Sequence, residues 1–261
     1  MAMLRMGGMM LLLAMVSGLS ATEVEISAGS EQFLWEEFAD NGEKLLDETG
    51  LRHFVAIRGS NHFDPLWSTS FMGRFYSGVV DYDGQTQLGD SVQTKVDYQG
   101  MRFEIGLSRR VGAIAMQPGA SQWWLDFVLG NDFWRRHLRD TTLNDGITPV
   151  SGYTEYYSSL YGRLGSRYQS GAGLSAGFGA KLPFHTDEQI TYAGETITLN
   201  PQGRLSLYAH LAYDFNPAWG IALAYDSYRF AKSDTVSVGS VIIWQPESSQ
   251  DTLALSMHYR F

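Results

Sequence analysis

The chain has 261 residues, a formal net charge of −9, 44% hydrophobic residues and 18% charged residues. This composition excludes an intrinsically disordered chain, and the absence of a Lys/Arg cluster argues against nucleic acid as a partner. Aromatic residues reach 13%, with 28 Gly and 7 Pro, a balance typical of many strands joined by tight turns. Cysteine is absent, so passage through an oxidising compartment carries no risk of mispaired thiols.

The N-terminal residues have the features of an export signal. Arg5 supplies a positive start, residues 6–16 are apolar, and small residues within 17–21 suit cleavage by a signal peptidase. The apolar run is too short to span a bilayer comfortably, which argues against an uncleaved anchor helix. We therefore expect residues 1–21 to be a cleaved signal peptide and residues 22–261 to form the mature domain.

The clearest periodic pattern closes the chain. Its apolar face and its mixed face alternate strictly: Leu253, Leu255, Met257, Tyr259 and Phe261 against Thr252, Ala254, Ser256, His258 and Arg260. Alternation over about ten residues predicts a β-strand with one apolar face, and that length suits a tilted strand crossing a hydrocarbon core.

The same alternation recurs upstream, for example where Met101, Phe103 and Ile105 face away from Arg102 and Glu104. It predicts strands at residues 27–38, 50–59, 67–82, 93–110, 119–135, 152–166, 171–183, 203–215, 219–231 and 251–261. Short turns near 167–170 and 216–219 alternate with longer loops near 39–49, 83–92, 136–151, 184–202 and 232–250.

These strands predict an all-β protein, a transmembrane antiparallel up-and-down β-barrel of about ten strands, with eight or twelve as alternatives. A strand backbone in lipid is satisfied only when the sheet closes. Both chain ends and the short turns would then lie on the periplasmic side, and the long loops would face outward. A water-soluble sandwich also alternates, but long strands with aromatic residues near their ends favour the membrane barrel.

With its export signal, its amphipathic strands and its final Tyr259-Arg260-Phe261, the chain resembles the outer-membrane β-barrel superfamily of Gram-negative bacteria. The resemblance covers the whole mature domain. It implies an outer-membrane localisation, contact with membrane lipid and lipopolysaccharide, and reading of Phe261 by the barrel-assembly machinery.

The face opposite the apolar face is rich in charge. Its expected lumen-lining residues are Arg74, Arg102, Glu104, Asp126, Glu155, Arg163, His210, Asp214 and Asp226. Barrels near eight strands are just wide enough for side chains to fill, so paired charges across the lumen would plug it. A narrow, porin-like pore or a small-ligand site lined by these residues is the alternative.

Two groups of residues are candidates for chemistry at the outer rim. Asp81 and Asp83 end the third predicted strand, and His185 and Asp187 follow the seventh. A His beside carboxylates can act as a general base. The placement resembles that of the omptins, ten-stranded outer-membrane proteases with an Asp pair and an Asp–His pair in the second and fourth outer loops, although the second pair here runs His-then-Asp.

The sequence predicts no cofactor and no metal site. The run from Asp81 to Gly84 begins like a calcium loop, but Gln85, Thr86 and Val92 stand where an EF-hand needs an oxygen ligand, Gly and Glu. The acidic residues expected on outer loops are Asp40, Glu43, Asp47, Glu48, Asp81, Asp83, Asp187, Glu188 and Glu195. They could meet the divalent cations that bridge lipopolysaccharide.

The leading hypothesis is therefore a small outer-membrane barrel with a structural, surface-interaction or narrow-pore role and no enzymatic activity. An omptin-like protease that uses the rim Asp and His residues is the alternative. The pattern leaves the oligomeric state open.

Overall fold

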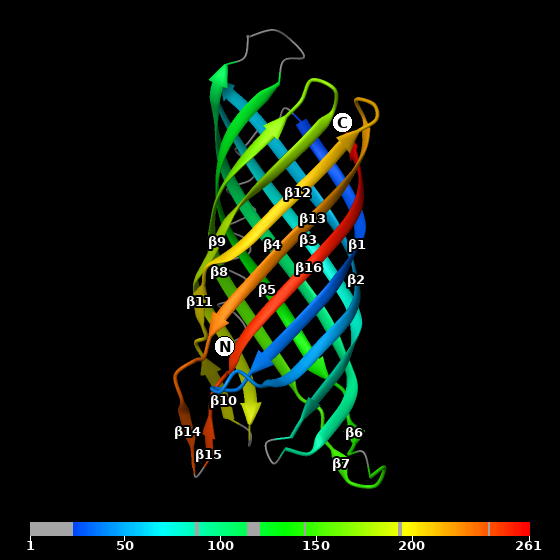
Figure 1. The fold of residues 1–261 in the computed structure, drawn as a ribbon, viewed down its shortest axis with the longest axis vertical. Helices are drawn as coiled ribbons and strands as arrows, with labels where there is room; N and C mark the ends of the chain where they lie inside the picture. The colour runs from blue at the N-terminus through cyan, green and yellow to red at the C-terminus, as the bar shows by residue number, and fades with distance from the viewer. Residues whose placement is uncertain (1–22, 87–88, 114–120, 144, 193–194, 240) are drawn as a thin grey trace.

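The computed structural model describes residues 23–86, 89–113, 121–143, 145–192, 195–239 and 241–261. The predicted signal peptide, residues 1–21, lies outside the described residues. Ten long strands run up and down the molecule (Figure 1): β1 (Glu23–Phe38), β2 (Lys44–Asp64), β3 (Trp67–Gln85), β4 (Ser91–Ala113), β5 (Gln122–Leu138), β8 (Thr154–Gln169), β9 (Leu174–Tyr192), β12 (Ser206–Asp214), β13 (Trp219–Ala231) and β16 (Glu247–Arg260). The prediction of an all-β barrel of about ten strands is confirmed.

The sheet closes on itself because every long strand has a partner on both sides. β1 pairs with β16 and with β2, and β8 pairs with β5 and with β9, all antiparallel. The resulting ring order is β9-β12-β13-β16-β1-β2-β3-β4-β5-β8. Among the described residues, no helix has the length and apolar character needed to cross a membrane.

The two ends of the barrel differ in their connections (Figure 1). One end, the turn end, carries tight turns at residues 65–66, 170–173 and 215–218 and the chain terminus, where the Phe261 amide donates to the Val24 carbonyl at 2.9 Å. Gly173 has a φ of +85° in one of these turns, a conformation that glycine adopts without strain.

The other end, the loop end, carries the longer connections and six short strands. These are β6 (Thr141–Thr142), β7 (Pro149–Val150), β10 (Glu195–Leu199), β11 (Gln202–Arg204), β14 (Val236–Val238) and β15 (Val241–Ile243). β6 pairs with β7 and β14 with β15 to form hairpins, while β10 and β11 join the barrel wall beside β9 and β13.

The outer face of the barrel is apolar from the turn end to about its middle. Large apolar side chains stay exposed there on all ten strands: Ile26, Val55, Ile57, Phe75, Ile105, Phe127, Leu129, Leu164, Phe178, Leu207, Leu223 and Leu255. We call this zone the apolar band. Aromatic side chains border it at the turn end, where Trp219 packs on Tyr259 at 4.8 Å and Trp123 on Tyr168 at 5.1 Å. Such aromatic girdles mark the membrane–water interface of barrels.

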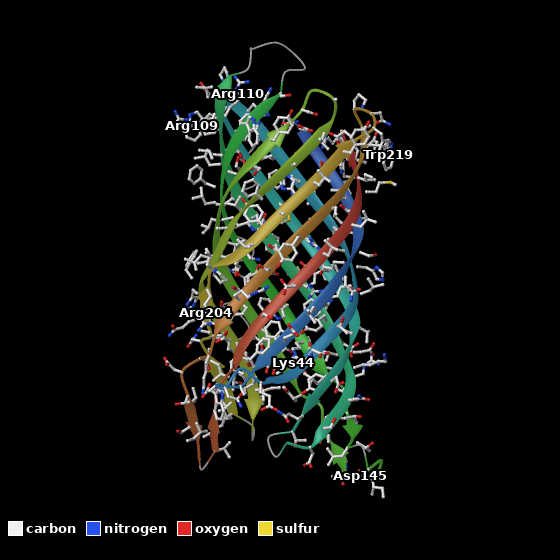
Figure 2. The ribbon with its side chains drawn as sticks, in the orientation of Figure 1. Lys44, Arg109, Arg110, Asp145, Arg204 and Trp219 are labelled. Carbon is white, nitrogen blue, oxygen red and sulfur yellow. The ribbon has the colours of Figure 1, made fainter. Side chains whose placement is uncertain are left out.

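Beyond the apolar band the strands continue toward the loop end with a polar outer face. Asp81 pairs with Lys95 at 2.7 Å, and Arg229 pairs with Asp251 at 2.9 Å. We call this part of the barrel the outer segment. In Figure 2, Arg109 and Trp219 lie toward the turn end, while Lys44 and Asp145 lie toward the loop end.

The outer segment explains where the predicted strand boundaries are wrong. β2 begins at Lys44 rather than at residue 50, β9 continues to Tyr192 rather than ending at 183, and β16 begins at Glu247 rather than at 251. In these stretches both faces of the strand carry polar residues, so the apolar–polar alternation disappears although the backbone pairing continues.

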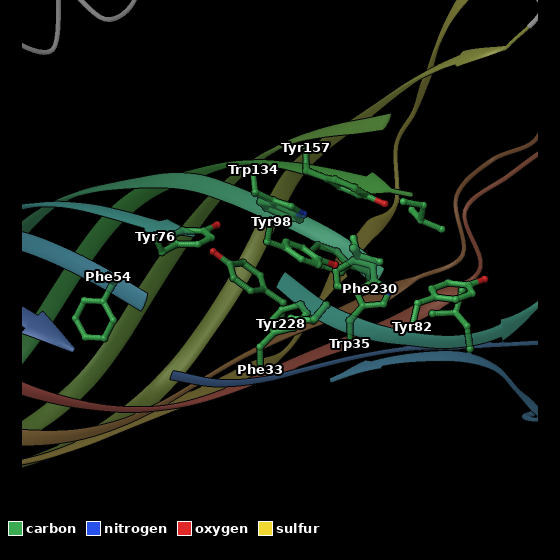
Figure 3. Packing of buried hydrophobic residues seen from close by; sticks show 14 of the residues in the cluster. Phe33, Trp35, Phe54, Tyr76, Tyr82, Tyr98, Trp134, Tyr157, Tyr228 and Phe230 are labelled. Atoms are coloured by element: carbon green, nitrogen blue, oxygen red, sulfur yellow. The ribbon is translucent and has the colours of Figure 1, made fainter. Parts of the chain in front are cut away.

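The core of the protein is the filled lumen. Trp35 on β1 contacts Tyr157 on β8 with ring centroids 5.8 Å apart, although these two strands lie on opposite sides of the ring. Tyr157 stacks on Trp134 at 4.7 Å, and Trp35 also contacts Phe230 of β13 at 6.4 Å. Figure 3 shows these rings converging from several walls. Side chains therefore bridge the full width of the lumen.

Interior glycines make room for the largest rings. A Cβ built on Gly100 would lie 2.3 Å from the Tyr76 ring, and one on Gly130 would lie 2.4 Å from the Tyr161 ring. Because nothing projects from these two positions, the tyrosines lie across the neighbouring strand and reach carboxylates. Tyr76 donates to Asp132 at 2.9 Å, and Tyr161 donates to Glu104 at 2.5 Å.

Asp226 on β13 is the hub of the central charges. Its carboxylate accepts from Arg102 of β4 at 2.9 Å, from Arg163 of β8 at 2.8 Å and from Lys181 of β9 at 2.8 Å. Arg102 also donates to Asp132 of β5 at 2.7 Å. Since β4 and β13 face each other across the ring, these pairs tie opposite walls together.

Asp226→Asn should strongly destabilise the folded barrel, because it leaves three buried cations without their shared carboxylate. Breaking a buried ion pair from one side costs about 3–5 kcal/mol. The measurement is the free energy of unfolding in denaturant for protein refolded into lipid vesicles. Asp97→Asn is the matched control, since Asp97 pairs with Arg139 on the outer face and an exposed pair contributes about 0–1 kcal/mol. If the two variants lost the same free energy of unfolding, the central role of Asp226 in the lumen would be contradicted.

Candidate functional site

The nine residues expected to line the lumen all project inward. Arg102, Glu155 and Asp226 are buried, and the others are partly buried on inward-facing strand positions. Near the turn end, Arg167 donates to Asp126 at 3.1 Å, and Asp214 contacts His258 at 2.7 Å. The lumen charges therefore form three successive groups: one near the turn end, the central group around Asp226, and one at the loop end.

The loop-end group lies within the outer segment and is unlike the other two. Glu37, Glu48, Arg136, Glu155 and Glu188 project inward from β1, β2, β5, β8 and β9, and we call them the mouth cluster. All five are buried. Their neighbours on the same strands, including Glu36, Asp47, Arg135 and Asp187, belong to the polar outer face, so the cluster lies beyond the apolar band.

Arg136 is the centre of this cluster. It donates to Glu48 at 2.7 Å through Nε and also binds Glu155. The Tyr98 hydroxyl donates to Glu48 at 2.5 Å, and the Tyr157 hydroxyl donates to Glu155 at 3.2 Å. Two carboxylates thus share one guanidinium, and each also accepts a hydrogen bond from a tyrosine hydroxyl, so both have the partners that buried charges require.

In the part of the chain that the structure describes, neither of the other two carboxyl groups forms an ion pair. Glu37 accepts from the Trp35 indole at 2.9 Å and from the Gln245 amide at 3.0 Å, which are neutral donors. Glu188 is 1% exposed, and its Oε2 has no hydrogen-bond partner among the described residues. A buried carboxylate with an oxygen that has no hydrogen-bond partner is costly, whereas the protonated form is much less so.

Protonation of these two groups follows from their surroundings. Burial, reinforced by the charges of Glu155 and Glu37, raises the pKa of Glu188 well above its usual value. Burial and the Glu155 charge likewise raise the pKa of Glu37, against the opposing effect of Arg136. Desolvation disfavours the charged form of an acid. Both carboxyls therefore stay neutral to a higher pH than exposed glutamates do.

The structure does not bring the four rim candidates together. Asp81 and Asp83 project from the outer face of β3, where they contact Lys95 at 2.7 Å and Gln93 at 3.4 Å. His185 and Asp187 contact each other at 3.3 Å on the outside of β9. β4, β5 and β8 lie between these two strands. The residues that point into the barrel at these places are Tyr82 and Thr186.

A register shift explains the position of His185. The pairing of β8 with β9 is irregular between Leu160 and Tyr161, opposite His185 and Pro183. Such an irregularity adds a residue to one strand and changes which side chains face outward after it. Phe184 and His185 consequently both lie exposed outside the barrel.

Two acids expected on solvated loops are instead part of the mouth cluster. Glu48 is fully buried and Glu188 is almost so, because β2 and β9 extend through the segments predicted as loops. The sequence does contain an indication for Glu48: it lies four residues before Arg52, and residues an even number apart on a strand lie on the same face. Among the described residues, no group of three or more His, Cys, Asp or Glu has a geometry that could hold a metal ion.

No protein-family model matches this chain, and no curated protein is similar to it. Among similar solved structures is the outer membrane protease OmpT from Escherichia coli, 13% identical over 93% of this chain and 99% of that chain, with a TM-score of 0.55. The COG4313 outer membrane channel from Pseudomonas putida F1 is 11% identical over 92% of this chain and 96% of that chain, with a TM-score of 0.47.

At 13% identity the likeness to OmpT concerns the fold, and it agrees with the physical features of the chain. The ten long strands close into a ring in which each is paired on both sides, the outer face carries an apolar band with an aromatic border, and the interior is polar and paired. These are the features that lipid imposes on a spanning sheet. The chain therefore has the fold of a transmembrane β-barrel.

Proposed function

We propose that this protein is a closed membrane anchor that presents a rigid outer segment and its hairpins at the cell surface, with a structural or surface-interaction role. The observation that carries the proposal is the set of contacts that bridge the lumen. Membrane lipid and lipopolysaccharide are the partners proposed for its outer face.

The filling of the lumen argues for an anchor over a pore. The ring contact between Trp35 and Tyr157 and the ion pair between Arg102 and Asp226 each join opposite walls. The two contacts involve different strands and different levels of the barrel. A conducting path would have to displace both, and each is backed by further buried partners such as Trp134 and Lys181.

The outer segment suits the presentation of a surface. Its strands are paired well beyond the apolar band, for instance where Asp47 lies opposite Asp83 and Gln93 lies opposite Asp83 on the next strand. The β6–β7 and β14–β15 hairpins, each paired within itself, follow this paired part of the barrel along the chain. Loops positioned by a rigid scaffold are the usual places for binding.

The protease alternative lacks support from the rim residues. Asp81 and Asp83 on one outer wall and His185 and Asp187 on another cannot act on the same bond, since a nucleophile and its base must lie within hydrogen-bond reach. A peptide library incubated with the refolded protein should remain uncut. Cleavage that is lost in Asp83→Ala would reopen this alternative.

Planar-bilayer recording tests the closed lumen. The wild-type protein should insert without discrete conductance steps, because cross-lumen side chains fill its width. Steps whose size changes in Arg163→Ala, an inward-facing residue paired with Asp226, would contradict the proposal and favour a narrow pore. Arg135→Ala, on the outer face of β5, is the control that should leave any such steps unchanged.

Labelling of single introduced cysteines tests which end of the barrel faces the outside of the cell, since the native chain contains no cysteine. Ile147 is 83% exposed at the tip of the β6–β7 hairpin, and Ala172 is exposed in the β8–β9 turn at the opposite end. A membrane-impermeant maleimide should label Ile147→Cys on intact cells and Ala172→Cys only after the outer membrane is permeabilised. The reverse pattern would overturn the orientation.

A further inference from the structure

A cavity of about 470 Å³ opens at the turn end of the barrel, near the ends of β2 and β4 and the start of β5. Its volume falls within the range of small-molecule sites, about 300–1,000 Å³. The side chains on its wall include His62, Phe63, Asp64, Arg110, Gln122 and Trp124. Because the cavity lies at the turn end, a ligand can reach it without passing the contacts that fill the middle of the lumen.

Arg110 and Trp124 belong to the inward faces of their strands. Arg110 follows Arg102 by eight residues on β4, and Trp124 precedes Asp132 by eight residues on β5. Residues an even number apart on a strand share a face, and both Arg102 and Asp132 are buried in the lumen. The cavity is therefore part of the turn-end mouth of the lumen.

The residues that directly precede these two lie on the outer face. The Arg109 guanidinium is 5.4 Å from the centre of the Trp67 ring, and Trp123 packs on Tyr168 at 5.1 Å. Figure 2 shows Arg109 and Arg110 together at the turn end. Each inward residue of the cavity thus has an outward neighbour of the same type, which serves as a matched control.

Two irregularities in strand pairing border the cavity. β2 has one residue more than β3 between His62 and Asp64, and β4 has one more than β5 between Arg110 and Ala113. Such bulges bend a strand and are frequent at barrel rims and beside active sites. The extra residue of β2 is Phe63, which lines the cavity and is 59% exposed. The first bulge therefore places an apolar ring on the cavity wall.

Arg110 brings an unpaired positive charge to this wall. Within the described part of the chain it forms no ion pair, and its Nε is buried without a hydrogen-bond partner. Arg167, which also lies near the turn end, pairs with Asp126 at 3.1 Å. Asp64, on the same wall as Arg110, accepts from the Leu66 amide at 2.8 Å. Since buried polar groups nearly always have a partner, Arg110 is suited to receive an anion.

The surroundings of Arg110 are held in place. Its backbone amide donates to the Leu66 carbonyl at 2.7 Å, which ties β4 to the β2–β3 turn. Trp124 is 2% exposed, and its ring contacts the Arg167 guanidinium at 5.4 Å and the His62 ring at 5.6 Å. The Trp124 Nε1 is a second buried donor that no described residue accepts. A preformed wall with unused N–H donors favours a ligand that is rich in acceptors.

We propose that this cavity binds a small organic anion: a carboxylate or phosphate group meets Arg110, and a ring attached to that group lies against Phe63. A planar guanidinium matches either oxyanion with parallel N–H donors, and an exposed aromatic side chain supplies apolar contact area. This inference goes beyond surface presentation, because it assigns a site to the opposite end of the barrel. It holds whichever way the barrel is inserted, and it leaves the lumen closed.

Calorimetric titration of the full refolded protein in detergent micelles tests the site, with empty micelles as the blank. Phenyl phosphate and benzoate carry a ring and an anion, inorganic phosphate has no ring, and benzyl alcohol has no charge. At least one ring-bearing anion should bind at one site per chain, and the tighter of the two identifies the preferred oxyanion. Inorganic phosphate and benzyl alcohol should each bind at least about tenfold more weakly, because each lacks one of the two contacts.

Matched variants separate the cavity from the rest of the turn end. Arg110→Gln should weaken binding of the ring-bearing anion at least about tenfold, the effect of losing a hydrogen bond to a charged group, whereas Arg109→Gln should leave it unchanged. Phe63→Ser should lower the affinity toward that of inorganic phosphate. Leu66→Ser is its control, because Leu66 is exposed on the same turn but does not line the cavity.

Three results would overturn the proposal. The first is that neither phenyl phosphate nor benzoate binds the wild-type protein, a result that does not depend on whether any variant folds. The second is that inorganic phosphate or benzyl alcohol binds as tightly as the ring-bearing anions. The third is that Arg110→Gln and Arg109→Gln bind with the same affinity as the wild-type protein.

Discussion

The whole structure depends on one constraint: a closed sheet in lipid must turn its apolar side chains outward, so its interior is built from polar groups that have to find partners across the lumen. Arg102 reaches Asp226 on the opposite wall, and Asp226 in turn holds Arg163 and Lys181. A buried charge is tolerated only when it is paired and hydrogen-bonded. The pairs therefore serve as the core of the protein and fill its lumen.

The kinds of residue that this constraint selects for the two faces of the sheet change along the barrel axis. Within the apolar band, lipid demands apolar residues outside and paired charges inside. In the outer segment the outer face meets water, so charged residues such as Asp81 and Arg229 are exposed there, while aromatic rings such as Trp35 and Trp134 take over the interior. The mouth cluster lies where these rings surround four carboxyl groups and Arg136, the one cation that pairs with them among the described residues.

The positions of the membrane-spanning strands were predictable because lipid outside and a polar lumen inside impose a strict alternation of apolar and polar residues. Leu253, Leu255 and Met257 alternate with polar residues, and the structure exposes all three on the outside. The extensions of β2 and β9 were not predictable in this way, since no lipid sorts the side chains of the outer segment. Backbone pairing alone continues the sheet there, and it leaves no sign in the composition.

The rim residues illustrate the same limit. Asp81 and Asp83 continue the face of Phe75 and Val79, so their spacing already placed them on the outer wall. The position of His185 was beyond sequence analysis, because it depends on the irregular pairing near Leu160. The mouth cluster depends on the ring order that brings β1, β2, β5, β8 and β9 around one space, and only the closed barrel reveals it.

The central claim is that contacts across the lumen hold opposite walls together. A double-mutant cycle between Arg102 and Asp226 tests it most directly, using Arg102→Gln, Asp226→Asn and the combined variant, with unfolding free energies measured in vesicles. Residues that contact one another usually show an interaction energy of about 0.5–3 kcal/mol, and we expect a value toward the upper end of that range for this buried pair. Additive losses, with an interaction energy of zero within error, would contradict the account.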